Sequence, residues 1–478
     1  MGLNKYIADQ RIEGGIVMGH IKITKGLDIP IKGAPTGSPR ALRFEGEGAS
    51  SSPLIALDLT QLEGVKFKVL VGLDEQVKLG QPLVEDKDCP GRVFVSPAGG
   101  LVREIRRGLK RRLLYIVIEV AREEAIEQHP TISLGEISRE AFLERLKAGG
   151  LFSCIRQRPF NRLANPTKIP RSIFVKAIES APFTPPAELQ VAGYEKEFQT
   201  GLEALAKLTT GSVHLVHRQG TSSRAFSEAA GVVIHTAEGP HPIANLSLHI
   251  ERIDPIQSAE DIVWTIDAHN VVAIGYFVIT GRYFVHRVVS VAGPGLLEGK
   301  TGFFSLREGF PISTLVAGRA KEGPMRLISG NPLTGHQVGF EDFLGREDTV
   351  FCMIPENRER EFLSFFRWGA NKYTFSRGYA SGYRQHADSR YDFTTNQHGE
   401  HRPFIESGLY DEVMPLNIPT VALMRAILAE DYDLAVELGL LEVDGEDFAL
   451  PSFVCPSKIE MVQIVNNGLR RHASEVLS

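Results

Sequence analysis

The chain has 478 residues, of which 43% are hydrophobic and 23% are charged. This length predicts about three domains of roughly 150 residues each, and the ordinary composition excludes a disordered or fibrous chain. The formal net charge of -5 gives no overall attraction for nucleic acid, so we expect no nucleic-acid partner.

The N-terminal residues, 1–19, are polar and predict an irregular extension before a first strand at His20–Thr24. Met18 stands just before that strand, so it is an alternative translation start to Met1.

Residues 20–127 predict a small all-β domain. Val69–Ile105 alternates apolar and polar residues between glycine and proline turns, as expected of short strands at regular spacing. The pattern resembles the biotinyl/lipoyl carrier sandwich, in which Lys87 would be the modified residue. A Pro90–Gly91 turn follows Lys87 where the carrier pattern continues as strand, so we interpret the domain as a structural relic of that fold. A carrier module modified at Lys87 is the alternative.

The stretch Arg103–Arg112 holds six basic residues in ten. No aromatic residues interleave with them for base stacking, so we interpret it as a solvated hairpin tip between two strands. Attraction to a phosphate surface or an acidic partner is the alternative.

Residues 136–258 predict a parallel α/β domain, because strand-like and helix-like segments alternate. Strands are expected at Ser172–Ile178, Ser212–His217 and Gly231–His235, and helices at Glu136–Gly149 and Tyr194–Leu208.

Residues 261–340 predict a compact β-rich domain, and residues 341–478 a mixed and then helical C-terminal domain. In the former, Phe277–Ile279 and Tyr283–Val285 flank Thr280–Arg282 and predict a β-hairpin. Helical periodicity marks Ile418–Leu428, Asp431–Leu438 and Lys458–Ala473.

The segment Ala292–Thr301 ends like a phosphate-binding loop. A true loop of that kind needs a glycine five residues before Gly299, where this chain has Pro294, which has no amide hydrogen. We therefore expect a β-turn followed by a strand.

Two pairs of histidines have a spacing that could suit a metal: His241 with His249, and His398 with His401 beside Glu400. No helix is predicted that would place the second pair at i and i+4. We expect hydrogen-bonded structural loops and no metal site.

The four cysteines, Cys89, Cys154, Cys352 and Cys455, form no CxxC pair, which gives no signature of a metal or iron–sulfur site and is typical of a reducing compartment. The longest apolar stretches, Leu113–Ala121 and Val271–Thr280, are about half the length of a membrane span. No transmembrane segment is expected. The residues alone therefore indicate a multidomain assembly component.

The sequence also resembles the A-type peripheral subunit of the sodium-translocating NADH:quinone reductases over nearly the whole chain from about residue 20. The resemblance is carried in order by Lys22–Pro35, Ser96–Arg111, Leu151–Val175, Gly239–Ile256, Val271–Gly295, Leu327–Gly335, Tyr410–Val421 and Asp431–Lys458. It implies a multidomain α+β fold with a biotinyl/lipoyl-like β-sandwich, a Rossmann-like α/β domain, a small β-grasp-like (SLBB-type) domain and a helical C-terminal domain.

This family is itself similar to respiratory subunits that bind NADH and flavin and hold an iron–sulfur cluster. Where those relatives have a glycine-rich loop, Leu151–Pro166 has Arg, Pro and Phe side chains, which obstruct close approach of a nucleotide. Where they have four cysteines, this chain has Cys455, and Pro451 stands where the family often has a second cysteine. One thiolate cannot hold a cubane cluster.

The resemblance implies a peripheral subunit on the cytoplasmic face of the bacterial inner membrane. It would take part in electron transfer from NADH to ubiquinone coupled to sodium export, with no cofactor of its own. Flavins and iron centres are expected in the membrane and flavoprotein subunits of a six-subunit complex. An NADH- or flavin-binding subunit is the rival hypothesis. Candidates for a quinone or subunit interface are Lys25, Gly26, Asp28, Pro30, Arg156, Arg158, Pro159 and Phe160. The alternative, which we favour, is that both segments hold the domains together.

Overall fold

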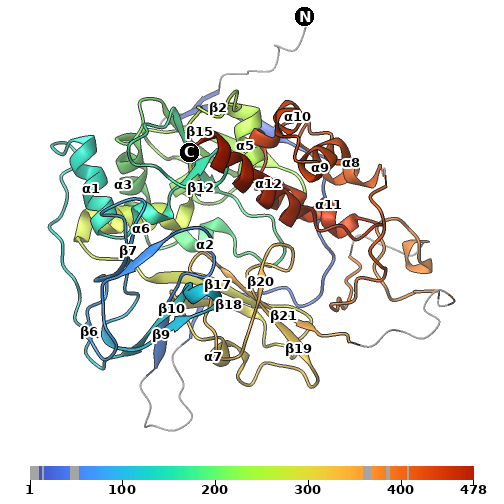
Figure 1. Cartoon of the computed structure of the whole chain (residues 1–478), viewed down its shortest axis with the longest axis horizontal. Coiled ribbons are helices and arrows are strands. Elements are labelled where there is room, and N and C mark those ends of the chain that lie inside the picture. The colour runs from blue at the N-terminus through green and yellow to red at the C-terminus, as the bar shows by residue number, and fades with distance from the viewer. Residues whose placement is uncertain are drawn as a thin grey trace, which may run out of the picture.

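The computed structural model of the chain describes residues 10–12, 15–42, 53–358, 366, 368–383, 388–405 and 408–477. Its described strands form four sheets, of eight, six, four and three strands. Figure 1 shows the blue strands β6, β9 and β10 on one side of the molecule and the orange-to-red helices α8 to α11 on the other.

The eight-stranded sheet is the centre of the fold, and its order is β1-β2-β15-β14-β13-β16-β11-β12. Five neighbouring strands, from β2 to β16, run parallel to one another. The strands are β1 (Gln10–Ile12), β2 (Gly15–Lys22), β11 (Arg156–Arg158), β12 (Arg162–Leu163), β13 (Ser172–Ala177), β14 (Ser212–Arg218), β15 (Val233–Glu238) and β16 (Val263–Asp267). The parallel α/β domain and its three predicted strands are confirmed.

Helices cover both faces of this sheet, because its central strands bury side chains on both sides. On β13, Ile173 and Val175 point into the core beneath α1, α3 and α6, whereas Phe174 points into the core shared with α5 and the C-terminal helices. These helices are α1 (Arg139–Ala148), α2 (Ala187–Val191), α3 (Glu195–Ala206), α4 (Arg224–Ser227), α5 (Leu246–Ile253) and α6 (Ala268–Thr280).

The hairpin predicted around Thr280–Arg282 is wrong, because the preceding residues form the buried helix α6. Its Val, Ile, Tyr and Phe residues favour strands locally, but α3 packs closely against it, and a Cβ on Gly275 would overlap the carbonyl oxygen of Glu197. Gly281 adopts a left-handed conformation (φ 69°) and ends the helix. Strand β16 thus belongs to the central sheet and α6 packs against it. The sequence pattern instead predicts a separate β-rich unit from residue 261 onward.

The extension predicted to be irregular at 1–19 also differs, because β1 and β2 pair with each other and β2 joins β15 in parallel. Backbone pairing with a distant strand leaves no periodic signal in a short polar segment. Met18 lies within β2, and Met1 lies outside the described residues.

The N-terminal β domain consists of two small sheets facing one core, β4-β10-β9-β6 and β5-β7-β8. Their strands are β4 (Leu54–Asp58), β5 (Phe67–Val69), β6 (Gln76–Val77), β7 (Pro82–Asp86), β8 (Val93–Val95), β9 (Gly100–Arg107) and β10 (Leu113–Val120). The short helix η1 (Leu109–Arg111) joins β9 to β10, so the end of the basic stretch, Gly108–Arg112, is a hairpin tip as predicted, whereas Arg103–Arg107 lie on β9. Lys87 lies exposed in the turn after β7.

The six-stranded sheet has the order β20-β19-β21-β17-β18-β3. Its strands are β3 (Arg40–Ala41), β17 (His286–Ala292), β18 (Gly302–Arg307), β19 (Met325–Ser329), β20 (His336–Val338) and β21 (Val350–Pro355), with α7 (Ile312–Val316) beside them. Because β17 and β18 pair antiparallel, the P-loop-like segment is a turn followed by a strand, as predicted.

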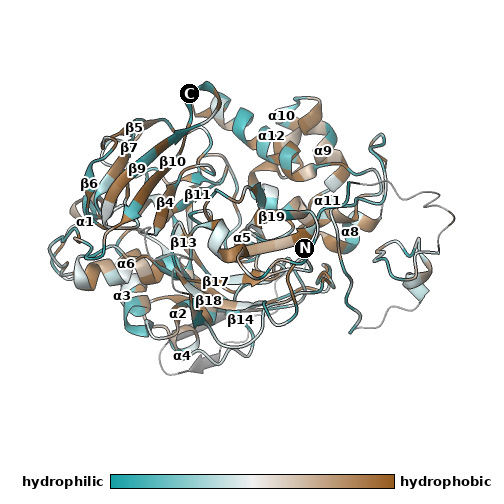
Figure 2. Cartoon of the chain, turned by 90° about the horizontal axis from the view of Figure 1, so that it is seen from below, coloured by the Kyte–Doolittle hydropathy of each residue, from teal (hydrophilic) through white to brown (hydrophobic). Residues whose placement is uncertain are grey.

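The C-terminal region is helical, and it packs on the α5 face of the central sheet. It contains α8 (Leu409–Val413), α9 (Thr420–Leu428), α10 (Tyr432–Glu437), α11 (Ala449–Val454), α12 (Met461–Val476) and several 3-10 turns, among them η6 (Gly445–Phe448). This confirms the three predicted helical segments. In Figure 2 the strands β5, β6, β7, β9 and β10 lie at one end of the view, and α8 and α11 lie toward the other. Among the described residues, no helix is long and apolar enough to cross a membrane.

Candidate functional site

The order of the central strands places a topological switch point between β13 and β16. From β13 the chain proceeds to β14 and β15 on one side, and then returns to form β16 on the other side. In open α/β sheets, ligands bind in the crevice at the carboxyl ends of the strands at such a point. Lys176 lies at the carboxyl end of β13, and Asp267 is the last residue of β16.

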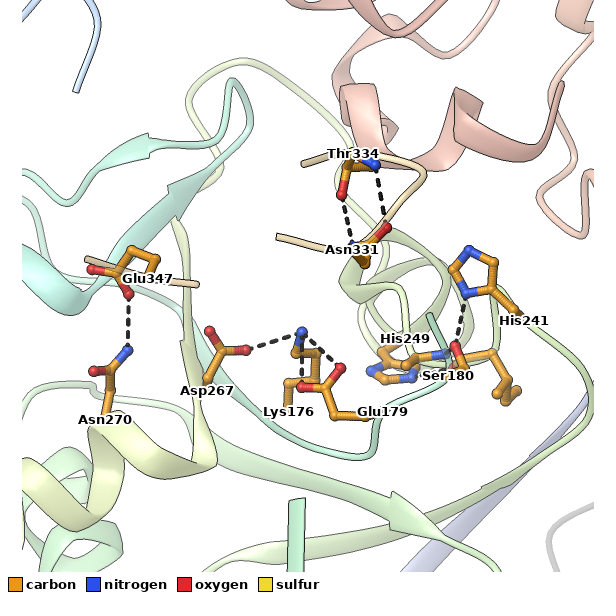
Figure 3. Close-up of polar contacts among 12 residues, drawn as sticks. Lys176, Glu179, Ser180, His241, His249, Asp267, Asn270, Asn331, Thr334 and Glu347 are labelled. Atoms are coloured by element: carbon orange, nitrogen blue, oxygen red, sulfur yellow. Dashed lines mark hydrogen bonds and ion pairs between the residues drawn. The ribbon is translucent and has the colours of Figure 1, made fainter. Parts of the chain in front are cut away.

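An ion cluster occupies this crevice. Lys176 Nζ lies 3.2 Å from Asp267 Oδ1 and 3.3 Å from Glu179 Oε1, as Figure 3 shows. The side chains of Lys176 and Glu179 are only 17% and 19% exposed. Burial opposes the charged form of Lys176, but the Asp267 and Glu179 carboxylates raise its pKa well above the ordinary value. The lysine therefore stays charged at all physiological pH values.

Further carboxyl groups line the same crevice from other parts of the chain. Burial raises the pKa of Glu179 to about 7, and burial likewise raises the pKa of Glu446, on η6, to about 7. Glu347 precedes β21 and accepts a hydrogen bond from Asn270 Nδ2 at 3.4 Å. Burial opposes its ionisation, but Arg346 and Arg287 lower the pKa of Glu347 to about 2.

The charge balance of the crevice matters for ligand binding. Lys176 faces the carboxyl groups of Asp267, Glu179 and Glu446, so acid exceeds base when all are ionised. Nucleotide phosphates bind to backbone amides and cations at such strand ends. This crevice presents carboxyl groups instead, which repel phosphates.

Two histidines beside the crevice are held by hydrogen bonds: His241 lies in a loop, as expected, whereas His249 lies on α5, where a loop was expected. His241 Nδ1 lies 3.0 Å from Ser180 Oγ, and a ring nitrogen of His249, Nε2, lies 2.8 Å from the carbonyl oxygen of Ile243 (Figure 3 shows both rings). Burial lowers the pKa of both rings to about 4, so both are neutral at pH 7. His398 and His401 are exposed. Within the described part of the chain, no cluster of three His, Cys, Asp or Glu side chains is arranged to hold a metal ion.

The candidate residues Arg156, Arg158, Pro159 and Phe160 lie on β11 and in the turn that joins it to β12. Arg158 is 2% exposed, donates to Ser247 Oγ at 2.7 Å and to the carbonyl of Glu442 at 3.2 Å, and lies 3.7 Å from Asp444. The rings of Phe160 and His472, on α12, have centroids 5.9 Å apart. This turn therefore joins the central sheet to the C-terminal helices.

The other candidate segment, Lys25 to Pro30, follows β2 and makes a similar connection elsewhere. Gly26 N donates to the carbonyl of Glu412 at 2.9 Å, and Asp28 Oδ1 accepts from the backbone N–H of His241 at 2.9 Å. The carbonyl of Pro30 accepts from Tyr391 N at 2.8 Å, while Lys25 is exposed.

A cleft of about 1580 Å³ brings part of the candidate set together with the crevice. Arg156, Arg158 and Phe160 line it, and so do Lys176, Asp267 and Glu446. None of the residues from Lys25 to Pro30 lines the cleft, so the two candidate segments do not form one site.

The ion cluster was not predicted from the sequence. Its available signals were a lysine inside the apolar strand SIFVKA and an aspartate at the junction of a strand and a helix. Neither is specific, because the partners of Lys176 come from segments up to 270 residues away along the chain.

The four cysteines lie in the interior of the protein. All four are buried and free of disulfides. Cys455 Sγ lies 3.1 Å from the hydroxyl oxygen of Tyr410, and Pro451 is part of α11.

Comparison with known proteins shows which family this chain belongs to. Three family models match the chain: the NqrA N-terminal barrel-sandwich hybrid domain over residues 21–121, the NqrA second alpha/beta domain over 137–283 and the NQRA C-terminal (SLBB) domain over 288–339. The NqrA subunit of the Na(+)-translocating NADH-quinone reductase of Chlamydia caviae is 36% identical over 95% of this chain and 97% of its own length. The chain belongs to the NqrA family.

The Saccharophagus degradans member of the family is 37% identical, covering 95% of this chain and all of its own. The family models confirm the barrel-sandwich, α/β and SLBB-type units that the resemblance implied. A solved NAD+-reducing [NiFe]-hydrogenase in the H2-reduced state matches 74% of this chain and 67% of its own at 13% identity, but its TM-score of 0.34 supports no argument.

Proposed function

We propose that this chain serves a sodium-pumping NADH:ubiquinone reductase as a peripheral subunit on the cytoplasmic side, without a redox centre of its own. It takes part in electron transfer to ubiquinone coupled to Na+ export by organising the complex. The flavins and iron centres belong to the membrane and flavoprotein subunits, and NADH and ubiquinone are substrates of the whole complex. Membership of the NqrA family supports this assignment.

The observation that carries the proposal is the acidic lining of the crevice at the switch point. Lys176 is paired with Asp267 and Glu179 at the strand ends where a doubly wound sheet receives a nucleotide, and Glu446 adds a further carboxyl group from the C-terminal region. Buried carboxyl groups favour a neutral or cationic neighbour over a diphosphate. The chain is therefore better suited to a structural role there than to dinucleotide binding.

The two candidate segments fit such an organising role. Arg158 and Phe160 hold α12 and the Glu442–Asp444 turn to the central sheet, and Gly26 and Asp28 hold the chain end of β2 to the C-terminal region and to the His241 loop. We assign both segments primarily to holding the domains in a fixed arrangement. Quinone or subunit contact is proposed only for their accessible parts, Lys25 and the cleft-facing side of Arg156.

One observation favours the rival function, an NADH- or flavin-binding subunit. The cleft beside Arg156 exceeds the roughly 300–1,000 Å³ of ordinary small-molecule sites and adjoins the strand ends where nucleotides bind. Under that hypothesis its cations, among them Arg162, would meet the phosphates. The carboxyl groups of Glu446 and Asp267 in the same cleft oppose this.

Purification from native membranes tests the assembly proposal. The chain, tagged at its own locus and solubilised in mild detergent, is expected to co-purify with hydrophobic flavoprotein subunits in equal amounts. Recovery of the chain alone, at low salt and with intact partner subunits in the same extract, would contradict it. An intact mass equal to the sequence mass would eliminate the carrier alternative at Lys87.

A further inference from the structure

The hairpin tip between β9 and β10, Gly108–Arg112, is a built turn with an unusual display of side chains. Gly108 N donates to the carbonyl of Arg112 at 2.8 Å, and Arg111 N donates to that of Gly108 at 3.1 Å. Lys110 and Arg111 both adopt left-handed backbone conformations, with φ of 54° and 60°. Left-handed conformations are costly for residues with side chains, so the turn forms against local preference.

Leu109 stands at the apex of this tip and is 93% exposed, the highest value among the exposed large hydrophobic side chains of the described residues. A single exposed leucine is ordinary on a protein surface. Its surroundings make it informative, because cations flank it on both sides along the chain.

The six cations of Arg103–Arg112, on β9 and in the tip, fall into two groups. Arg103 and Arg106 are neutralised by the Glu119 and Glu104 carboxylates, and Arg112 lies 3.7 Å from Glu63. A second group has no such partner: across the described part of the chain, no carboxylate lies within 4.0 Å of Arg107, Lys110 or Arg111. Arg107 donates to the backbone carbonyl of Arg111, which aligns it with the turn.

We propose that this tip docks on an anionic lipid surface, with Leu109 entering the interfacial layer and Arg107, Lys110 and Arg111 contacting headgroup phosphates. An apolar side chain surrounded by long, flexible cations is the composition that binds at the boundary of headgroups and acyl chains. An exposed tip with one apolar side chain suits a deformable anionic surface better than a protein partner, which would need a matching pocket for Leu109 and placed carboxylates for each cation.

Docking of the tip on lipid rests on the proposed position of the chain at the membrane, but lipid binding is measured separately from assembly with the other subunits. The purified full-length chain is mixed with vesicles of phosphatidylcholine alone or with vesicles that also contain about 30% phosphatidylglycerol, an anionic lipid. The vesicles are then sedimented at low and at high salt. We expect binding to the anionic vesicles, weakened by salt, and little binding to the neutral ones.

Two variants locate the contact. Leu109→Ser is expected to lower the partition coefficient roughly tenfold, and the triple variant Arg107→Gln, Lys110→Gln, Arg111→Gln roughly a hundredfold. The matched controls are Leu73→Ser, at another exposed leucine of the same domain, and the triple variant Lys196→Gln, Arg224→Gln, Lys300→Gln, with the same change of net charge.

Three outcomes would overturn the inference. The first is equal binding of the parent chain to neutral and anionic vesicles, and the second is an equal loss of binding in the tip triple variant and the control triple variant. The third is a tip variant that binds vesicles as the parent does but no longer co-purifies with the partner subunits. The last outcome would assign the tip to a protein partner. Because vesicle binding needs no other subunit, its failure leaves the co-purification test of the proposed function intact.

Discussion

The ammonium nitrogen of Lys176 lies 3.2 Å from Oδ1 of Asp267, and this ion pair joins the carboxyl ends of the two strands that flank the switch point. A doubly wound sheet normally leaves that place open for a ligand. Here Glu179 and Glu446 add carboxyl groups to the same place, and Glu446 comes from the C-terminal region. One ion cluster thus makes the crevice acidic and joins two parts of the chain.

Replacing Lys176 should lower the stability of the fold, because the buried carboxyl groups of the ion cluster lose their counter-ion. In Lys176→Met the Asp267 and Glu179 carboxyl groups lose their counter-ion, so we expect a destabilisation of about 2–3 kcal/mol at pH 8, allowing for the partial exposure of Asp267. At pH 5.5 the loss should be smaller, because burial raises the pKa of Glu179 to about 7 and its protonated carboxyl group needs no counter-ion. The measurement is urea unfolding followed by tryptophan fluorescence, to which Trp264, buried on β16, contributes. The pair Lys68–Glu85, whose lysine side chain is 63% exposed, gives the control Lys68→Met, expected to change little.

Glu446 should give the fold a specific pH dependence. Its pKa is raised by burial from 4.5 to about 7, so the folded state binds its proton more tightly than the unfolded state does. The stabilisation from this group is complete below about pH 4.5 and is lost as pH rises through about 7. Glu446→Gln should therefore be more stable than the parent chain by about 1–2 kcal/mol at pH 8 and nearly equal to it at pH 5.

Melting temperatures measured from pH 5 to pH 8 test this. The Glu446→Gln curve should be flatter than that of the parent, and the exposed Glu298→Gln control should run parallel to the parent. Parallel curves for Glu446→Gln and the parent would contradict the assignment of a buried, protonatable carboxyl group.

Arg158 should hold the C-terminal helices in place. Arg158→Met removes the donors to Ser247 and to the Glu442 carbonyl and leaves Asp444 without this counter-ion, at a cost of about 3 kcal/mol. We expect faster hydrogen exchange in α12 and easier proteolysis around residue 444, with little change in the N-terminal β domain. Arg224→Met, at an 87% exposed side chain, is the control. Uniform loosening of the whole chain would argue against a local role.

Gly26 should be intolerant of any side chain. Its φ of 139° disfavours other residues, and an added Cβ would overlap the carbonyl oxygen of His241. Gly37→Ala separates the two effects, because Gly37 also has positive φ but has open space around it. We expect Gly26→Ala to lower the melting temperature clearly more than Gly37→Ala does. Equal effects would mean that the strap formed by Lys25–Pro30 and the His241 loop is looser than described.

Elements with a local signal were predictable from the sequence. The apolar face and Gly149 stop of α1, the strand β13 and the helices α9, α10 and α12 all follow from periodicity within one segment. The basic hairpin tip was predictable because a basic stretch without aromatic residues separates two strand-like segments.

Elements decided by distant contacts were not predictable in the same way. The strand formers of α6 become helical because the helix is packed closely against α3, and β2 is a strand because β15 lies beside it. The ion cluster is the extreme case, since Lys176 and Glu446 meet only when the whole chain has folded. Family resemblance supplied what such reasoning could not, namely the role of the protein.

The most direct test of the central claim is a cofactor and ligand analysis of this chain separated from its complex. The polypeptide is dissociated from the native complex, its flavin and iron are quantified per chain, and NADH and FMN are titrated into it calorimetrically. We predict flavin and iron far below one per chain and no saturable heat with either nucleotide. Stoichiometric flavin or iron, or a saturable NADH or FMN site lost in Arg156→Ala, would contradict the account.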